Sequence, residues 1–332
     1  MRGELMTTKG TFADVIDPQV RAMFDNHAEE QSNELYYKEL GLNDYEPDVP
    51  EEKMQEMSGP GRGQITIEGQ DYAKNSKVKG YPVTLTLRKY TFDLEWTEED
   101  VHWLAKQSSS KRASDLRDAA SGAVQALYQN INEDTAKVFY LGHGTTFLTV
   151  GNSEALYGSH TLKGTSETQR NTFPSGDTHR AFGPTPLTDA ISIMNRFKAH
   201  NGIQMKRVRS LKLLVATEGI AAANQVIYSM YGPNNANLGL SQASKDALAR
   251  RKMTIEAVEV PDFPYAYRNY WSLVDTQRAT RRAFMAWAWK PRMTRDSIAK
   301  KGTLKMLGST LFGPIVLGWQ WTFGSKGDGS AI

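Results

Sequence analysis

A long run of helical periodicity after residue 96 restricts the fold more than any other feature of the sequence. Thr97 is followed by three acidic residues, which is typical of a helix N-cap because the side chains satisfy free amides and favour the helix dipole. Apolar residues then recur mostly at spacings of three and four, namely Val101, Leu104, Ala105, Leu116, Ala120, Ala123, Val124, Leu127 and Ile131. A helix continuous to Asn130 would be about 50 Å long. Such a helix is a scaffold element, unless Ser108–Ser110 divides it into two.

Two strand-like runs precede this helix, Gln64–Glu68 and Val83–Trp96. In the second run the apolar alternation shifts by one residue between Leu87 and Tyr90, which predicts a bulge or bend there. The two runs predict a long hairpin with a kinked strand and a polar tip at Asp71–Gly80. We expect the tip to contact an adjacent subunit, because its own chain offers nothing to pack against. The candidate contact residues are Lys74, Lys77 and Lys79.

Charge is divided unevenly along the chain. Residues 1–58 carry 14 acidic and 5 basic side chains, a net charge of −9, and the remaining 23 acidic and 35 basic residues give +12. Residues 1–58 also hold few apolar clusters, so we expect an extended arm with a short helix near Val15–Phe24, followed by a breaker-rich linker at 48–63. The acidic and basic parts either form separate solvated faces or meet within or between subunits.

The last two-thirds of the sequence predict an α+β domain. A strand at Thr146–Val150 leads into a polar segment that lasts until Pro186, and loops of that length usually have a function or a partner. Expected helices are Leu187–His200 and Glu218–Met230, and expected strands are Leu211–Ala216, Thr254–Val260, Trp271–Val274, Ala283–Trp289 and Leu317–Phe323. In the last strand Leu317, Trp319, Trp321 and Phe323 alternate with smaller or polar residues, which predicts a half-buried antiparallel strand.

Patterns that carry chemistry are missing from the sequence. The chain has no cysteine, which excludes disulfides and thiolate metal sites and fits folding in a reducing cytoplasm. The six histidines, His27, His102, His143, His160, His179 and His200, show no metal-ligand spacing. Gly59–Gly63 follows a polar linker and precedes a strand, so it is a hinge and not a phosphate-binding loop. No nucleophile elbow or Walker lysine occurs. We therefore expect no enzyme activity, no cofactor and no membrane span.

The order of these elements resembles the tailed-phage major capsid proteins of the Hong Kong phage fold. Gly80–Asp100 is similar to the family's passage from extended loop to spine helix, and Leu156–Leu162 is similar to a phrase that follows that helix. Pro186–Asn201, with Leu211–Val215 and Glu218-Gly219 after it, resembles the start of the family's axial domain. The resemblance covers residues 60–323.

The resemblance implies a division of the chain into five parts. These are an N-terminal arm and linker (1–58), an extended hairpin loop (59–96), a peripheral domain with the spine helix and polar loop (97–185), an axial domain (186–290) and returning C-terminal strands (291–332). It further implies hexamers and pentamers in an icosahedral head around double-stranded DNA, assembled in the bacterial host cytoplasm. Any scaffolding protein would be separate, and portal and decoration proteins are further expected partners. No self-cross-linking Lys–Asn pair is identified. The alternatives are an encapsulin-like nanocompartment shell, a tail or connector protein and a hydrolase.

Residues 276–301 are strongly basic, with Arg278, Arg281, Arg282, Lys290, Arg292, Arg295, Lys300 and Lys301 against one acid, Asp296. Met285, Trp287 and Trp289 alternate within this segment, which favours core packing over stacking on nucleic-acid bases. The basic residues either contact the acidic arm of a neighbouring subunit or attract packaged DNA without sequence specificity. Arg292, Arg295, Lys300 and Lys301 are therefore candidate inter-subunit contacts.

Overall fold

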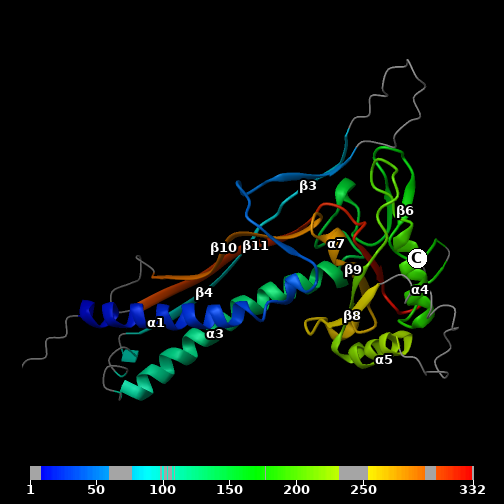
Figure 1. The fold of residues 1–332 in the computed structure, drawn as a ribbon. Coiled ribbons are helices and arrows are strands. Elements are labelled where there is room, and N and C mark those ends of the chain that lie inside the picture. Colours follow the sequence, from blue (N-terminus) through cyan, green and yellow to red (C-terminus); the bar gives the residue numbers. More distant parts are fainter. Residues whose placement is uncertain are drawn as a thin grey trace, which may run out of the picture. The chain divides into compact units, whose positions relative to one another are not determined.

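The computed structural model describes residues 9–59, 77–97, 99–100, 103, 107, 109–175, 177–231, 253–295 and 304–330. It contains helices and mixed sheets, so the predicted α+β class is confirmed (Figure 1). The chain forms two compact units. Unit 1 comprises Met1–Tyr36, Leu87–Asn132 and Trp287–Gly313, and unit 2 comprises Tyr37–Thr86, Glu133–Ala286 and Pro314–Ile332. Four described elements continue from one unit into the other: η1 (Tyr36–Lys38), α3 (Ser109–Tyr140), β10 (Ala283–Arg295) and β11 (Leu304–Val316).

Unit 1 combines helices with long antiparallel strands. Its other elements are α1 (Lys9–Ser32) and β4 (Arg88–Trp96), and β4 pairs with β11 from Trp96–Leu304 to Arg88–Phe312. The sheet order is β1-β10-β11-β4, where β1 (Asn43–Tyr45) pairs with the first residues of β10. Phe24 of α1 stacks on Phe92 with ring centroids 6.3 Å apart. Tyr128 of α3 donates to the Ala28 carbonyl at 2.7 Å.

The helix N-cap predicted at Thr97 is present. The Asp100 amide donates to Thr97 Oγ1 at 3.2 Å, and Asp100 accepts from the Thr97 amide at 3.0 Å. The long helix itself is not continuous with this cap, because the chain bends at Gln107 and α3 begins at Ser109. The helical region is therefore divided into two next to Ser108–Ser110, which is the alternative that the sequence left open. α3 has 32 residues and a length of about 48 Å, and it ends at Tyr140, ten residues beyond the expected end.

The N-terminal helix is longer than the predicted Val15–Phe24. α1 spans 24 residues, and Val20 and Phe24 are fully buried. Further along the same region, Leu40 and Leu42 are buried in unit 2, where β1 pairs in parallel with Phe284–Ala286. The expectation of an extended segment is wrong here, because its few apolar residues are spaced so that other elements of the chain cover them.

The hairpin differs from the prediction in its first strand. β2 (Lys53–Ser58) pairs antiparallel with β3 (Val78–Thr84), with an irregularity between Gln55 and Met57. β2 lies in the segment that was expected to be a linker. The strand expected at Gln64–Glu68 lies outside the described residues. The bulge or bend predicted between Leu87 and Tyr90 is not there, because β4 pairs with β11 in unbroken register from Arg88 onwards. The interruption lies just before it, since β3 ends at Thr84 and β4 starts at Arg88.

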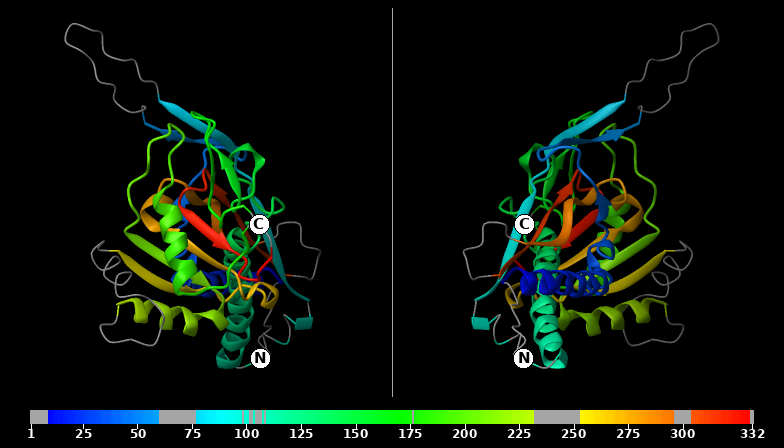
Figure 2. Two further views of the ribbon diagram at one scale, coloured as in Figure 1. Left: turned by 90° about the vertical axis from the view of Figure 1, so that its right-hand side faces the viewer. Right: turned by 90° about the vertical axis from the view of Figure 1, so that its left-hand side faces the viewer.

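Unit 2 is built on a mixed four-stranded sheet with the order β12-β9-β7-β8. Figure 2 shows the helices α4 and α5 beside this sheet. β7 pairs in parallel with β8 and antiparallel with β9, and β9 pairs antiparallel with β12. Every residue of β9 and β12 is buried. The elements are α4 (Pro184–Asn195), β7 (Ser210–Val215), α5 (Ile220–Tyr231), β8 (Thr254–Glu259), β9 (Trp271–Asp275) and β12 (Thr322–Ser325). The helix predicted at Glu218–Met230 and the strands predicted for residues 211–274 are thereby confirmed. The helix predicted at Leu187–His200 ends earlier, at Asn195, and Lys198 instead forms a bridge with Gln204.

Short elements fill the connections of unit 2. These are η1 (Tyr36–Lys38), η2 (Gly151–Ser153), β5 (Ser159–Thr161), β6 (Thr168–Arg170), η3 (Thr217–Gly219), η4 (Tyr265–Tyr267) and α7 (Thr276–Ala279). The strand predicted at Thr146–Val150 is wrong, since Val150 makes only an isolated bridge to Glu154. The polar segment that follows contains the β5–β6 hairpin.

The predicted terminal strand Leu317–Phe323 is also wrong. β11 ends at Val316 and β12 begins at Thr322, and the Thr322 amide donates to the Trp319 carbonyl across a turn. Gln320 is as fully buried as Trp321. The alternation that predicted one buried and one exposed face failed because this turn is covered on all sides.

Candidate functional site

A cavity of about 570 Å³ in unit 2 is lined by residues from four parts of the sequence, two of which supply basic side chains. It is lined by Gln55, Glu56, Met57, Met205, Lys206, Arg207, Asp275, Gln277, Arg278, Arg281, Arg282 and Leu317. We call it the basic pocket. Five of these residues are cationic and two are acidic, so the lining has a net charge of +3.

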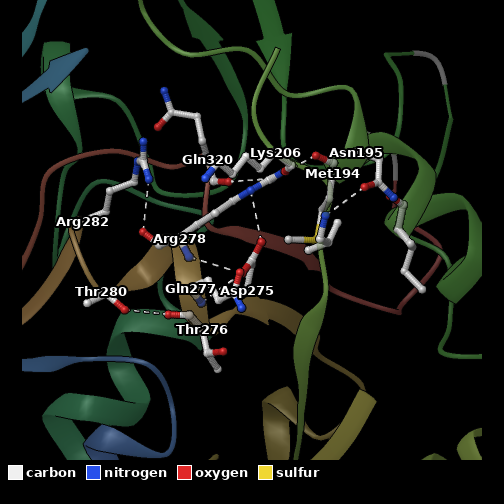
Figure 3. Close-up of polar contacts among 12 residues, drawn as sticks. Met194, Asn195, Lys206, Asp275, Thr276, Gln277, Arg278, Thr280, Arg282 and Gln320 are labelled. Carbon is white, nitrogen blue, oxygen red and sulfur yellow. Dashed lines mark hydrogen bonds and ion pairs between the residues drawn. The ribbon is translucent and has the colours of Figure 1, made fainter. Parts of the chain in front are cut away.

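A buried ion pair between Asp275 and Arg278, drawn in Figure 3, belongs to the lining of the basic pocket. Asp275 caps α7 by accepting from the amides of Gln277 and Arg278 at 3.0 and 3.3 Å. The Arg278 Nε lies 3.1 Å from the Asp275 carboxylate. Burial raises the pKa of Asp275, and Arg278 opposes that increase.

The Arg278 guanidinium also connects segments that are distant in sequence. It donates to the carbonyls of Met194 at 3.0 Å and Gln320 at 3.3 Å, and to the carbonyl of Lys206. α7, the end of α4, the loop after it and the turn before β12 are thus tied to one side chain. Burial of a charge is tolerated when it is paired and hydrogen-bonded in this way.

A second ion pair, between Glu56 of β2 and Arg282, also belongs to the lining of the pocket. Arg282 pairs with the buried Glu56, whose other carboxylate oxygen lies 3.8 Å from Nε2 of the buried His200. The Lys163 amide donates to His200 Nδ1 at 3.3 Å, so the proton of a neutral ring is assigned to Nε2, facing Glu56. Burial lowers the pKa of His200, whereas Glu56 opposes that decrease.

The rim of the basic pocket is formed by exposed cations. Lys206, Arg207 and Arg281 are exposed and form no ion pair with any other described residue. Beside them Met57 is 59% exposed, although it is a large apolar residue. Cations of this kind bind carboxylates and phosphates. The arrangement is suited to binding an acidic partner, and it contains no activated nucleophile.

Metal binding has no support in the described part of the chain, where no group of three or more His, Asp or Glu residues is placed to hold an ion. The buried His160 contacts Glu154 at 2.9 Å and Asn171 at 3.2 Å, and its ring stacks on Trp319. Of the described helices, none is long and apolar enough to cross a membrane.

None of the described candidate contact residues predicted from sequence lines the basic pocket, although Lys79 is the cross-strand partner of Met57 in its lining. Lys77 and Lys79 are exposed at the start of β3 in unit 2. Arg292 is exposed in unit 1, with its guanidinium 4.4 Å from the centroid of the Trp289 ring. Arg295 ends β10. Lys74, Lys300 and Lys301, and the side chain of Arg295, lie outside the described part of the chain.

The sequence did contain a signal for the pocket rim. Residues 190–217 carry six basic residues and no acidic one: Arg196, Lys198, Lys206, Arg207, Arg209 and Lys212. The run at 276–301 is more strongly basic and dominates the charge pattern of the sequence. The role of Glu56 gave no such signal, because its partners Arg282 and His200 are far away in sequence.

Comparisons with known proteins give matches in structure alone. No protein-family model matches the sequence, and no curated protein matches it in sequence. A chain in the structure titled "Mycobacterium phage Patience" has a TM-score of 0.51 and 13% identity, over 94% of this chain and 90% of that one. The structure titled "Capsid of native GTA particle computed with C5 symmetry" matches with a TM-score of 0.48 and 12% identity, over 87% and 89%. "The capsid of Myoviridae Phage XM1" matches with 0.46 and 10%, over 88% and 91%. The first likeness shows that this chain has the phage capsid fold.

Proposed function

We propose that this chain is the major capsid protein of a tailed phage, a structural subunit that assembles into the hexamers and pentamers of an icosahedral head. The observation that carries the proposal is the fold shared with a phage chain over 94% of this sequence and 90% of that one. The elements that such a subunit needs are present: a long helix, a β-hairpin and a mixed sheet with helices beside it. Many modest contacts repeated over a closed symmetric shell sum to a large stabilisation.

The proposal includes the place and partners of the shell. The subunit would be made and assembled in the bacterial cytoplasm and would end in the virion, around double-stranded DNA that it contacts without sequence specificity. Separate scaffolding, portal and decoration proteins are further proposed partners. Residues 186–290 would act as the axial domain, and the chain would catalyse no reaction.

Negative-stain electron microscopy of the purified full-length protein tests the proposal. We expect angular shells large enough for a phage genome. Small shells would favour a nanocompartment, tubes or rings a tail or connector protein, and isolated particles at high concentration would contradict any shell. Nuclease-protected DNA in particles from infected cells would separate a genome container from an empty compartment.

A further inference from the structure

The basic pocket has a counterpart elsewhere on the same chain. The loop between β1 and β2, residues 46–52, presents Glu46, Asp48 and Glu51, and all three are exposed. None of the three forms an ion pair with another described residue. We call this segment the acidic loop. The three free carboxylates match in number the three free cations of the pocket rim, Lys206, Arg207 and Arg281.

The acidic loop and the basic pocket also each carry an exposed apolar side chain. Few large apolar residues are exposed in the described part of the chain: Val49 at 49%, Met57 at 59%, Trp103 at 63% and Tyr265 at 67%. Val49 lies in the middle of the acidic loop, and Met57 lines the basic pocket. An exposed apolar side chain surrounded by unpaired charge is characteristic of an interaction surface, with a small dry centre and a charged rim.

The acidic loop is held in shape before it meets any partner. Tyr45 at its start donates to the carboxylate of Glu52 at its end at 2.6 Å, and this bond with Glu52 raises the pKa of Tyr45 to about 12. The Tyr45 ring contacts Phe284, with centroids 5.9 Å apart. Pro47 and Pro50 restrict the backbone between these anchors. A loop restricted in this way loses little entropy when it binds.

We infer that the acidic loop of one copy of this chain docks into the basic pocket of a second copy, with Val49 against Met57 and the loop carboxylates against Lys206, Arg207 and Arg281. Both surfaces are exposed on the single chain, so they do not satisfy each other there. The contact joins two different patches, and such head-to-tail contacts close into rings or extend as filaments. This inference rests on the proposed self-assembly and names a pair of surfaces that would carry it.

Phosphates of a nucleic acid are the competing occupant of the basic pocket. The acidic loop is favoured because the chain itself supplies an equal number of free carboxylates around an exposed apolar residue, and a phosphate backbone offers no partner for Met57. The two occupants can be distinguished, because only the protein contact brings residue 49 of one copy next to residue 57 of another.

Cysteine cross-linking of the full-length chain tests the inference, since the natural sequence has no cysteine and any disulfide must join introduced residues. In the double variant Val49→Cys/Met57→Cys, we expect oxidation to give a ladder of covalent oligomers. Mixing the two single variants should give mainly dimers. The matched control is Tyr265→Cys/Met57→Cys, whose new thiols are also exposed. Docked thiols react at a high effective concentration, so cross-linking should exceed this control at least about tenfold.

Charge reversal then identifies the surfaces. In the Val49→Cys/Met57→Cys chain, we expect Lys206→Glu/Arg207→Glu/Arg281→Glu to lower cross-linking to the control level. Adding Glu46→Lys/Asp48→Lys/Glu51→Lys should restore it, because the charges are then exchanged. Cross-linking no greater than the control, or unaffected by pocket reversal, would overturn the inference. Unchanged cross-linking with lost DNA binding would assign the pocket to nucleic acid. If the natural chain forms shells but the double-cysteine variant gives no cross-link above the control, the docking alone is rejected. If the variant cross-links but the natural chain forms no shells, the proposed function alone is rejected.

Discussion

Arg278 shows how a single side chain sets the geometry of unit 2. Its guanidinium pairs with Asp275 and donates to three backbone carbonyls from different segments. Sequence alone placed this residue among eight basic ones with a common role. The structure separates them, because Arg278 is buried whereas Arg281, three residues later, is exposed on the pocket rim.

We predict that Arg278→Ala destabilises the chain by about 3–5 kcal/mol, because it leaves the Asp275 carboxylate and three carbonyls buried without their partner. Urea denaturation followed by tryptophan fluorescence measures the change. Arg281→Ala serves as the control and should change the free energy of unfolding by less than about 0.5 kcal/mol. A loss below 1 kcal/mol for Arg278→Ala, on the scale of an exposed pair, would contradict a structural role.

His143 makes the stability of unit 2 sensitive to acid. Its ring lies 4.8 Å from Tyr157, 4.9 Å from His179 and 5.6 Å from Tyr270, measured between centroids. Burial, followed by the charges of His179 and Lys326, lowers the pKa of His143 to about 3. In the unfolded chain the pKa is about 6.5, so between these values the unfolded state binds more protons. This contribution to stability is therefore complete above about pH 6.5 and declines as the pH falls towards 3.

We predict that His143→Phe reduces the decline of the melting temperature between pH 7 and pH 5, because a phenyl ring fills the same aromatic site and takes up no proton. Calorimetric melting curves at several pH values measure the slope. Part of the slope should remain, since burial also lowers the pKa values of His179 and His200. A slope equal to that of the natural chain would show that His143 does not carry this sensitivity.

At the scale of elements, two of the three candidate contact lysines lie at the start of the second strand of the β2–β3 hairpin. Lys77 and Lys79 are exposed at its described end, and no ion pair holds either of them to another described residue. Their charges are therefore available to a partner. This placement is compatible with the proposed contact between subunits.

We predict that replacing Lys74, Lys77 and Lys79 with glutamate weakens shells without lowering the melting temperature of the isolated subunit. The reason is that exposed charges contribute little to folding but reverse the field presented to a neighbour. Shell yield at increasing salt and the melting temperature of the unassembled chain are the two measurements. Equal losses in both would place these lysines in contacts within their own subunit.

Periodicity predicted the elements that have one continuous buried face. α3 shows it in the spacing of Leu116, Ala120, Val124 and Leu127, all of which are buried. β7 was predicted because it is an apolar run of strand length. The N-cap at Thr97 was predictable because its hydrogen bonds join residues only three apart.

The elements that sequence did not predict depend on distant partners. β2 is a polar strand whose burial at Glu56 and Ser58 follows from the elements that cover it. The turn between β11 and β12 alternates like a strand, yet Gln320 is as buried as its apolar neighbours. The basic pocket combines residues 55–57, 205–207, 275–282 and 317. No local pattern brings these four segments together.

At the scale of the whole molecule, the basic residues near the end of β10 have two candidate partners, packaged DNA and a neighbouring subunit, and the two differ in their dependence on salt. Contacts with packaged DNA would weaken steeply with salt, whereas ion pairs that become buried between subunits are screened much less. Arg292 is exposed and stacked on Trp289, an arrangement that keeps its charge available to either partner.

We predict that neutralising Arg292, Arg295, Lys300 and Lys301 impairs the assembly of empty shells made without DNA, because we assign these residues to contacts between subunits. Sedimentation of shells assembled from purified protein measures the effect. Normal empty shells combined with defective packaging in infected cells would instead assign these residues to DNA.

The path of the chain through its two units gives the protein a resistance to proteolysis that two domains joined by a single linker lack. The backbone passes from one unit to the other five times, at residues 36–37, 86–87, 132–133, 286–287 and 313–314. A protease that cuts any single connection therefore leaves four intact. Three of the five passages run inside α3, β10 and β11, where the backbone is hydrogen-bonded and hard for a protease to engage. A nicked chain would migrate as two fragments on a denaturing gel and as one particle on a native gel, and in the shell that we propose, damage to one polypeptide need not open a gap in the wall.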